Sequence, residues 1–152
     1  MAATVISDSS MELAKELIKH FEGLKLIPYY CPAGVRTIGY GHAMRLGDEL
    51  PEQISQAIAE ELLEKDIIKA KTTLYRHCKV PLTSNQEAAL CSFIFNCGGG
   101  AFQSSTLRQK LSRCEYALAA NEFPRWVYSR GIKLGGLVKR RLAEQQMFLA
   151  VI

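Results

Sequence analysis

Four residues within the first 42 positions carry side chains that can transfer protons or activate water. Glu22 lies at the end of an apolar helical pattern, and Cys31, Thr37 and His42 follow it in a segment rich in glycine, proline and tyrosine. A carboxylic acid at the end of an apolar helix, followed by a hairpin with polar side chains, fits an acid-catalysed hydrolase, although by itself it is a weak signal. The apolar stripe and the last helical turn both disfavour a negative charge on Glu22, which suits a proton donor.

The elements that must position these residues follow from the apolar spacing. A helix is predicted from Ser9, which can form a capping box with Glu12, to a stop at Gly23. Residues 24–42 form short extended pieces broken by prolines and glycines, which predicts a small β-hairpin with its turn near residues 31–34. The acid is therefore expected at the junction of the helix and the hairpin.

A long helix is predicted next, from between Pro51 and Ser55 to about Tyr75. Its apolar stripe repeats every four residues and contains one polar member, Asp66, which needs a buried partner. His42, at the end of the hairpin segment, is the partner that we expect. Metal binding by His42 is not expected, because no second ligand lies at a suitable spacing.

The second half of the chain is predicted to be helical. Thr83 and Gln86 form a second capping box, at the start of a helix that ends at the glycines of residues 98–100. Shorter helical patterns follow at residues 105–112, 115–123 and 137–149.

We therefore expect an α+β fold, mainly α, with a single domain over residues 1–152. A small β-hairpin N-terminal lobe (about 9–54) is joined by a connecting helix (about 55–76) to a helical C-terminal lobe (about 80–152). A cleft between the two lobes is the expected place for a functional site.

Composition places the 152 residues among globular proteins. Apolar side chains make up 48% and charged ones 22%, and the five cysteines form no CxxC pair, so neither a metal nor a cofactor is expected. Residues 1–75 hold eight basic and eleven acidic side chains, whereas residues 76–152 hold eleven and four, a balance of +7. This asymmetry predicts contact with a polyanion. Nucleic acid is not the expected one, because no recognition-helix motif is present.

The spacing of Glu22, eight residues, Cys31, five residues and Thr37 resembles the catalytic signature of the phage-type lysozymes, or endolysins, of glycoside hydrolase family 24. In that family the signature reads Glu, eight residues, Asp or Cys, five residues, Thr. Residues 86–98 resemble the family's helix that ends in the motif FNxG. Further family motifs are matched in order at residues 100–102, 105–107, 122–126 and 136–141.

The resemblance implies a lysozyme-like fold and a muramidase that hydrolyses the β-1,4 bond between N-acetylmuramic acid and N-acetylglucosamine of bacterial peptidoglycan, with inversion. Such an enzyme would act as a phage or prophage endolysin in host lysis. Residue by residue, the resemblance implies that Glu22 is the general acid, that Thr37 holds or activates the attacking water, and that Asn96 lies along the sugar-binding cleft.

Cys31 stands where most members of the family place Asp. A thiol is only about 3% ionised at pH 7, so it is a weak electrostatic substitute unless it orients water by hydrogen bonding. Two alternatives therefore stay open. One is a catalytically weak lysozyme-fold module that binds peptidoglycan. The other is a cysteine hydrolase that cuts peptide stems, with Cys31 as nucleophile and His42 as base.

The resemblance also bears on four titratable or charged residues. In related lysozymes a His after the GxG segment pairs with an Asp on the connecting helix, which agrees with the pair of His42 and Asp66. Arg140 and Arg141 are expected to be surface charges, although in some relatives a basic residue of the last helix contacts the catalytic Glu.

The expected oligomeric state and cellular location follow from the resemblance and from the start of the sequence. The protein is expected to be a monomer without stable membrane insertion. Because the sequence begins without a long apolar segment, we expect it to wait in the host cytoplasm for a holin pore that releases it to the periplasm and cell wall, unless a signal anchor has been removed.

Overall fold

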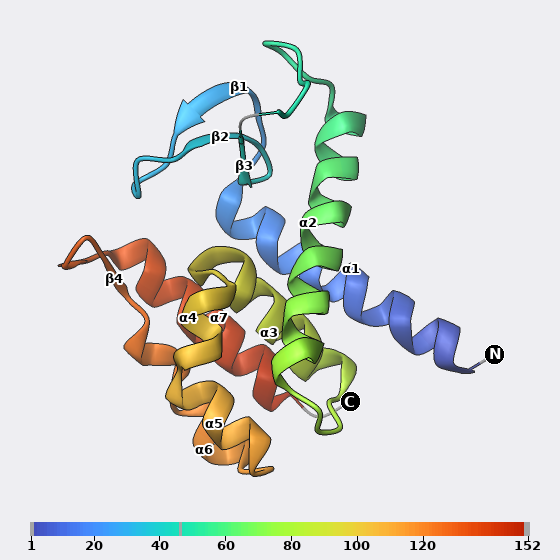
Figure 1. Ribbon diagram of the computed structural model, residues 1–152, viewed down its shortest axis with the longest axis vertical. Coiled ribbons are helices and arrows are strands. Elements are labelled where there is room, and N and C mark those ends of the chain that lie inside the picture. The colour runs from blue at the N-terminus through green and yellow to red at the C-terminus, as the bar shows by residue number, and fades with distance from the viewer. Residues whose placement is uncertain (1, 46, 151–152) are drawn as a thin grey trace.

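A computed structural model describes residues 2–45 and 47–150, and it is mostly helical with small antiparallel hairpins (Figure 1). The helices are α1 (Ala2–Glu22), α2 (Gln56–His77), α3 (Ser84–Cys97), α4 (Gly99–Ser104), α5 (Thr106–Ser112), α6 (Tyr116–Ala120), the 3-10 helix η1 (Phe123–Arg125) and α7 (Gly135–Leu149). The strands are β1 (Lys25–Tyr30), β2 (Arg36–Gly39), β3 (His42–Ala43), β4 (Tyr128–Ser129) and β5 (Ile132–Lys133). The expected α+β, mainly α class is confirmed.

Helix α1 begins earlier than its capping box suggested. Ser9 lies inside the helix, which starts at Ala2. The preceding residues contain neither proline nor glycine, so the chain can continue the helix in the N-terminal direction, and the spacing of Ser9 and Glu12 does not enforce a start. The predicted stop is in place, since Gly23 adopts φ +68° and its N–H donates to the carbonyl of Lys19 at 3.0 Å.

The predicted hairpin gains a third strand. Strands β1, β2 and β3 form an antiparallel sheet in that order, with Tyr29 opposite Thr37 and Ile38 opposite His42. The turn between β1 and β2 lies where the sequence predicted it, and the N–H of Gly34 donates to the carbonyl of Cys31 at 2.8 Å.

Helix α2 links the sheet to the helical half of the molecule (Figure 1). Ser55 caps its start by accepting a hydrogen bond from the N–H of Ile58 at 3.2 Å. Its buried face runs through Ala59, Leu63, Ile67, Ala70 and Leu74. Of the predicted stripe at a strict spacing of four, Ala70 and Leu74 lie on this face, whereas Ile58, Leu62 and Asp66 are half-buried at its edge. The two patterns differ because four residues turn the helix by more than a full turn of 3.6 residues. Asp66 therefore lies at the edge of the buried face, beside the sheet.

Helix α3 is the centre of the core, packed against α1, α2 and α7. Its capping box of Thr83 and Gln86 forms as predicted. Every residue from 87 to 94 is buried, polar ones included. The helix ends at Cys97, so its last turn carries Asn96 to the surface of the core.

The C-terminal half differs from the sequence-based prediction in three places. Helix α4 was not predicted, and it begins at Gly99, within the glycines that were expected only to end the preceding helix. The helix predicted at residues 115–123 is divided into α6 and η1, because Pro124 lacks the N–H that a continuing helix needs. The hairpin of β4 and β5 was not predicted. Each of its strands has two residues, which is too short for an alternating pattern to be visible.

Candidate active site

A cleft of about 430 Å³ lies between the small sheet, the end of α3 and the β4–β5 hairpin. Its lining includes Glu22, Cys31, Thr37 and Asn96. The structure thus brings together the residues that the sequence singled out for catalysis and substrate binding, although they come from α1, the β1–β2 turn, β2 and α3.

Glu22 is held in the cleft by two glycines. Gly23 ends helix α1 directly after it, which turns the backbone away and leaves the carboxyl group facing the cleft. Gly41, with φ +72°, packs against the side chain, and a Cβ at Gly41 would lie 2.6 Å from Glu22 Cδ. Any side chain at position 41 would therefore displace the carboxyl group.

Arg140 contacts Glu22 from the opposite lobe. Its Nη1 donates to Glu22 Oε2 at 2.6 Å, and the two side chains are 4% and 19% exposed. A charge-assisted hydrogen bond of this length fixes the direction of the carboxyl group.

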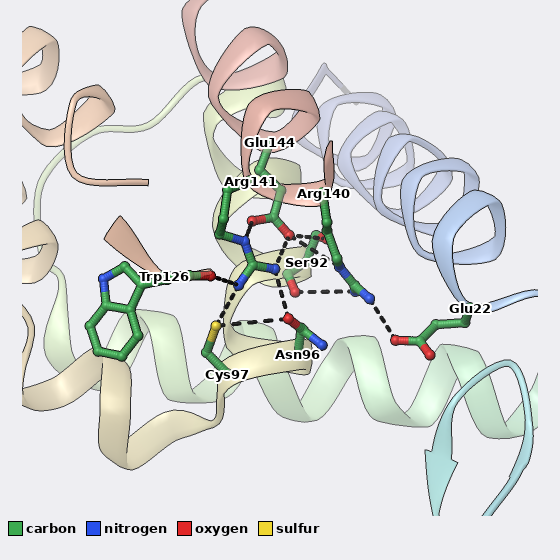
Figure 2. Close-up of polar contacts among 8 residues, drawn as sticks. All are labelled: Glu22, Ser92, Asn96, Cys97, Trp126, Arg140, Arg141 and Glu144. Atoms are coloured by element: carbon green, nitrogen blue, oxygen red, sulfur yellow. Dashed lines mark hydrogen bonds and ion pairs between the residues drawn. The ribbon is translucent and has the colours of Figure 1, made fainter. Parts of the chain in front are cut away.

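The expectation that Arg140 and Arg141 are surface charges is wrong, because both side chains are buried against α3. The side chain of Glu144, which is 0% exposed, compensates them (Figure 2). Glu144 lies 3.4 Å from Arg140 Nε and 2.8 Å from Arg141 Nε, and it accepts a hydrogen bond from Ser92 at 2.6 Å. Burial raises the pKa of Glu144, and the two guanidinium groups oppose that shift.

The buried ion pairs of Glu144 with Arg140 and Arg141 were not predicted from the sequence, although the spacing of these three residues was a signal. Glu144 follows Arg140 and Arg141 by four and three positions, so all three lie on one face of a helix, where opposite charges can be buried together. With Glu22 the network contains two carboxylates and two guanidinium groups, so its formal charges cancel.

Arg141 connects this network to Asn96, the residue that is expected to lie along the sugar-binding cleft. Its Nη2 donates to Asn96 Oδ1 at 2.8 Å, and its Nη1 lies 2.6 Å from Cys97 Sγ and 3.5 Å from the carbonyl of Trp126 (Figure 2). Because the amide oxygen of Asn96 accepts this bond, its NH₂ group is the part that can be offered to a sugar oxygen.

Thr37 and Cys31 share one carbonyl oxygen. The Thr37 hydroxyl donates to the carbonyl of Val35 at 2.8 Å, and the N–H of Cys31 donates to the same carbonyl at 3.0 Å. Since the hydroxyl proton of Thr37 is used in this way, its oxygen can act as an acceptor for a water molecule in the cleft. Thr37 is almost fully buried, so its orientation is fixed.

His42 lines a second cavity, of about 290 Å³, together with Asp48 and Asp66. Its Nδ1 lies 2.8 Å from Asp66 Oδ2, as the sequence suggested, and its Nε2 lies 3.4 Å from Asp48 Oδ2. The hydrogen bond with Asp66 is the largest cause of a raised pKa of His42. Because both ring nitrogens face carboxylates and Cys31 lines the other cleft, the structure does not assemble the pair that a cysteine hydrolase needs.

Over residues 2–45 and 47–150, no three or more His, Cys, Asp or Glu side chains are grouped so that they could hold a metal ion. In the same part of the chain, no helix combines the length and the apolar character that crossing a bilayer requires.

Known proteins resemble this chain in sequence and in structure. The family model described as phage lysozyme matches residues 19–144. The endolysin of Acyrthosiphon pisum secondary endosymbiont phage 1 is 44% identical over 136 residues, covering 87% of this chain and 92% of that protein. The muramidase domain of SpmX from Asticaccaulis excentricus is 32% identical with a TM-score of 0.80, over 91% of this chain and 95% of that one. The endolysin from Escherichia coli O157:H7 phage FAHEc1 is 30% identical with a TM-score of 0.79, over 95% and 92%. The expected lysozyme-like fold is confirmed.

Replacing Glu144 by glutamine should destabilise the protein strongly. Glu144→Gln leaves Arg141 buried beside a neutral group, and breaking a buried ion pair costs about 3 kcal/mol or more. Unfolding by urea measures this loss. Glu12→Gln is the matched control, since Glu12 is 74% exposed and lies 3.7 Å from Lys15, and its loss should cost less than about 1 kcal/mol. Equal stabilities of the two variants would contradict the structural role of Glu144.

The pair of His42 and Asp66 should make stability depend on pH. Because the pKa of His42 is raised above 6.5, protonation of His42 stabilises the fold, and this contribution is complete below about pH 6.5 and disappears as the pH rises through the folded-state pKa. The unfolding free energy of the wild type should therefore fall across that range. His42→Gln should abolish this part of the dependence, whereas His77→Gln should keep it. An NMR titration that places the pKa of His42 at or below 6.5 would disprove the pairing in solution.

Proposed function

The chain belongs to the phage lysozyme family, and on that basis we propose that Glu22 is the general acid of the lysozyme reaction and that the cleft beside it binds the glycan. The chain is a glycosidase of the lysozyme type, a phage muramidase endolysin that acts on bacterial peptidoglycan. Hydrolysis of the bond between N-acetylmuramic acid and N-acetylglucosamine opens the cell wall and lyses the host.

One observation carries the assignment of the acid. Among the described residues that line the cleft, Glu22 is the only one with a carboxyl group. Protonation of the glycosidic oxygen needs an acid within hydrogen-bonding reach of the scissile bond. A retaining mechanism needs a second carboxylate as nucleophile, about 5 Å from the first. The lining of this cleft supports inversion by a water molecule instead.

Thr37 and Cys31 are the residues that orient the attacking water. The Thr37 oxygen accepts a hydrogen bond from the water, which turns a lone pair of the water toward the anomeric carbon on the face of the sugar opposite Glu22. Cys31 adds a second polar contact on this side, as a hydrogen-bonding group more than as an anion, because an ordinary thiol is mostly neutral at pH 7. Both residues are oriented by the carbonyl of Val35.

Arg140 fixes the direction of the Glu22 carboxyl group. Its guanidinium also contacts Glu144 and Ser92, so it is held from several sides while its Nη1 donates to Glu22 Oε2. This contact holds the carboxyl group in the cleft, where the glycosidic oxygen must come within hydrogen-bonding reach.

The pair of His42 and Asp66 holds in place the backbone that packs against Glu22. His42 directly follows Gly41, the residue that packs against Glu22. Its hydrogen bond to Asp66 ties this part of the sheet to α2, which keeps the Gly41 backbone in place. We assign the pair a positioning role, and Asn96 a role in binding the sugar.

The remaining expectations stay predictions. They are the monomeric state, the absence of nucleic-acid binding, and storage in the host cytoplasm until a holin pore opens.

Glu22→Gln should abolish hydrolysis while the fold is kept. The amide has the shape of the acid but cannot donate a proton to the leaving oxygen, and such donation contributes about 100-fold or more. The release of reducing ends from purified peptidoglycan measures the activity. Glu16→Gln, an exposed change on the same helix, should leave it unchanged. A folded Glu22→Gln protein that keeps more than about a tenth of wild-type turnover would overturn the assignment.

Substitutions of Cys31 should separate its possible roles. If Cys31 assists water attack, Cys31→Asp should stay active because it restores a full negative charge, Cys31→Ser should be weaker, and Cys31→Ala should lose much of the activity. Cys114→Ser, which changes an exposed thiol, is the control. A folded but inactive Cys31→Asp beside an active wild type would contradict the role, and a protein mass increase at Cys31 with substrate would point to a nucleophile instead.

A further inference from the structure

Two large apolar side chains stay exposed although they line the cleft. Val35 of the β1–β2 turn is 42% exposed, and Tyr128, the first residue of β4, is 62% exposed. The other large apolar side chains with such exposure among the described residues do not line the cleft. Single exposed apolar groups are ordinary on an open surface, but inside a concave site they mark contacts with a ligand.

The fold makes little use of the Tyr128 ring. Within the part of the chain that the structure describes, Tyr128 makes no side-chain hydrogen bond, ion pair or aromatic contact. Trp126, which also lines the cleft, differs in this respect, because its ring packs edge-on against Phe93 with 5.4 Å between the ring centroids. The core therefore holds Trp126, whereas the ring of Tyr128 is available to a ligand.

The charges of the cleft favour an uncharged group beside Tyr128. Glu22 and Arg141 are the only acidic and basic side chains among the described residues that line it. The guanidinium of Arg141 is already engaged by Glu144 and by Asn96. A stem peptide carries free carboxylates, for which this lining offers no uncommitted cation, whereas the sugar rings of a glycan strand carry no charge.

We propose that Tyr128 is a stacking platform for one pyranose ring of the glycan strand. This inference rests on the proposed function of the cleft. A pyranose ring presents C–H groups on its face, and the face of an aromatic ring carries the partial negative charge that attracts them. Tyr128 belongs to a different element from Glu22 and Thr37. The stack therefore holds the sugar equally before and during bond cleavage.

Reducing-end release from glycan strands tests the platform. A contact that is equally strong before and during cleavage changes KM and leaves kcat alone. Tyr128→Ala should raise KM about five- to twentyfold, the range for losing contact with one face of an aromatic ring, whereas Tyr128→Phe should keep the wild-type KM. Tyr30→Ala is the matched control, since Tyr30 is 72% exposed and does not line the cleft. An unchanged KM in Tyr128→Ala, a loss of kcat alone, or equal losses in Tyr128→Phe and Tyr128→Ala would overturn the platform.

Removing the stem peptides from the substrate identifies the group that Tyr128 contacts. Treatment of peptidoglycan with an amidase leaves glycan strands without peptides. The rise in KM of Tyr128→Ala should be the same on these strands as on intact peptidoglycan. A rise confined to the intact substrate would assign Tyr128 to the stem peptide and would overturn the platform.

Binding without hydrolysis separates this inference from the proposed function. With the Glu22→Gln protein, calorimetry measures the Kd of the peptide-free strands, and adding Tyr128→Ala should raise that Kd by the same factor as KM. Strands that bind equally well with and without the Tyr128 ring, or that do not bind at all, would overturn the platform. A wild type that releases no reducing ends would instead refute the proposed function, while the binding experiment would still decide whether Tyr128 holds a sugar.

Discussion

The buried balance of charge among Glu22, Arg140, Glu144 and Arg141 is the constraint on which the candidate site depends. Two guanidinium groups that are 4% and 0% exposed can be buried without a large loss of stability only if carboxylates accompany them. Glu144 meets this need inside the core, and Glu22 meets it at the cleft. Helix α7 must therefore pack on α3 in the one orientation that gives both arginines their partners, and the acid becomes part of the packing of the C-terminal lobe.

The same network fixes the position of the candidate acid. Arg140 lies against Glu144 and the Ser92 carbonyl and hydroxyl as well as against Glu22. Its guanidinium is therefore held in place by the core, and it in turn orients the carboxyl group of Glu22.

The parts of the fold and site that could be predicted from the sequence are those with local signals. The capping box of Thr83 and Gln86, the stop at Gly23 and the spacing from Glu22 to Thr37 each involve residues close in the chain, so their geometry follows from one element or from two neighbouring ones. The contact of Glu22 with Arg140 spans 118 positions. The spacing of Glu144 from Arg140 and Arg141 is the one local sign of their burial, and hydropathy argues for the surface. The β4–β5 hairpin was missed because strands of two residues show no alternating pattern.

The carbonyl of Val35 joins the start of the β1–β2 turn to strand β2. It accepts hydrogen bonds from the backbone N–H of Cys31 and from the hydroxyl of Thr37. One backbone atom thus holds both the start of the turn and the side chain that we propose orients the water. A change in the turn that moves Val35 therefore alters both residues together, because they share this acceptor.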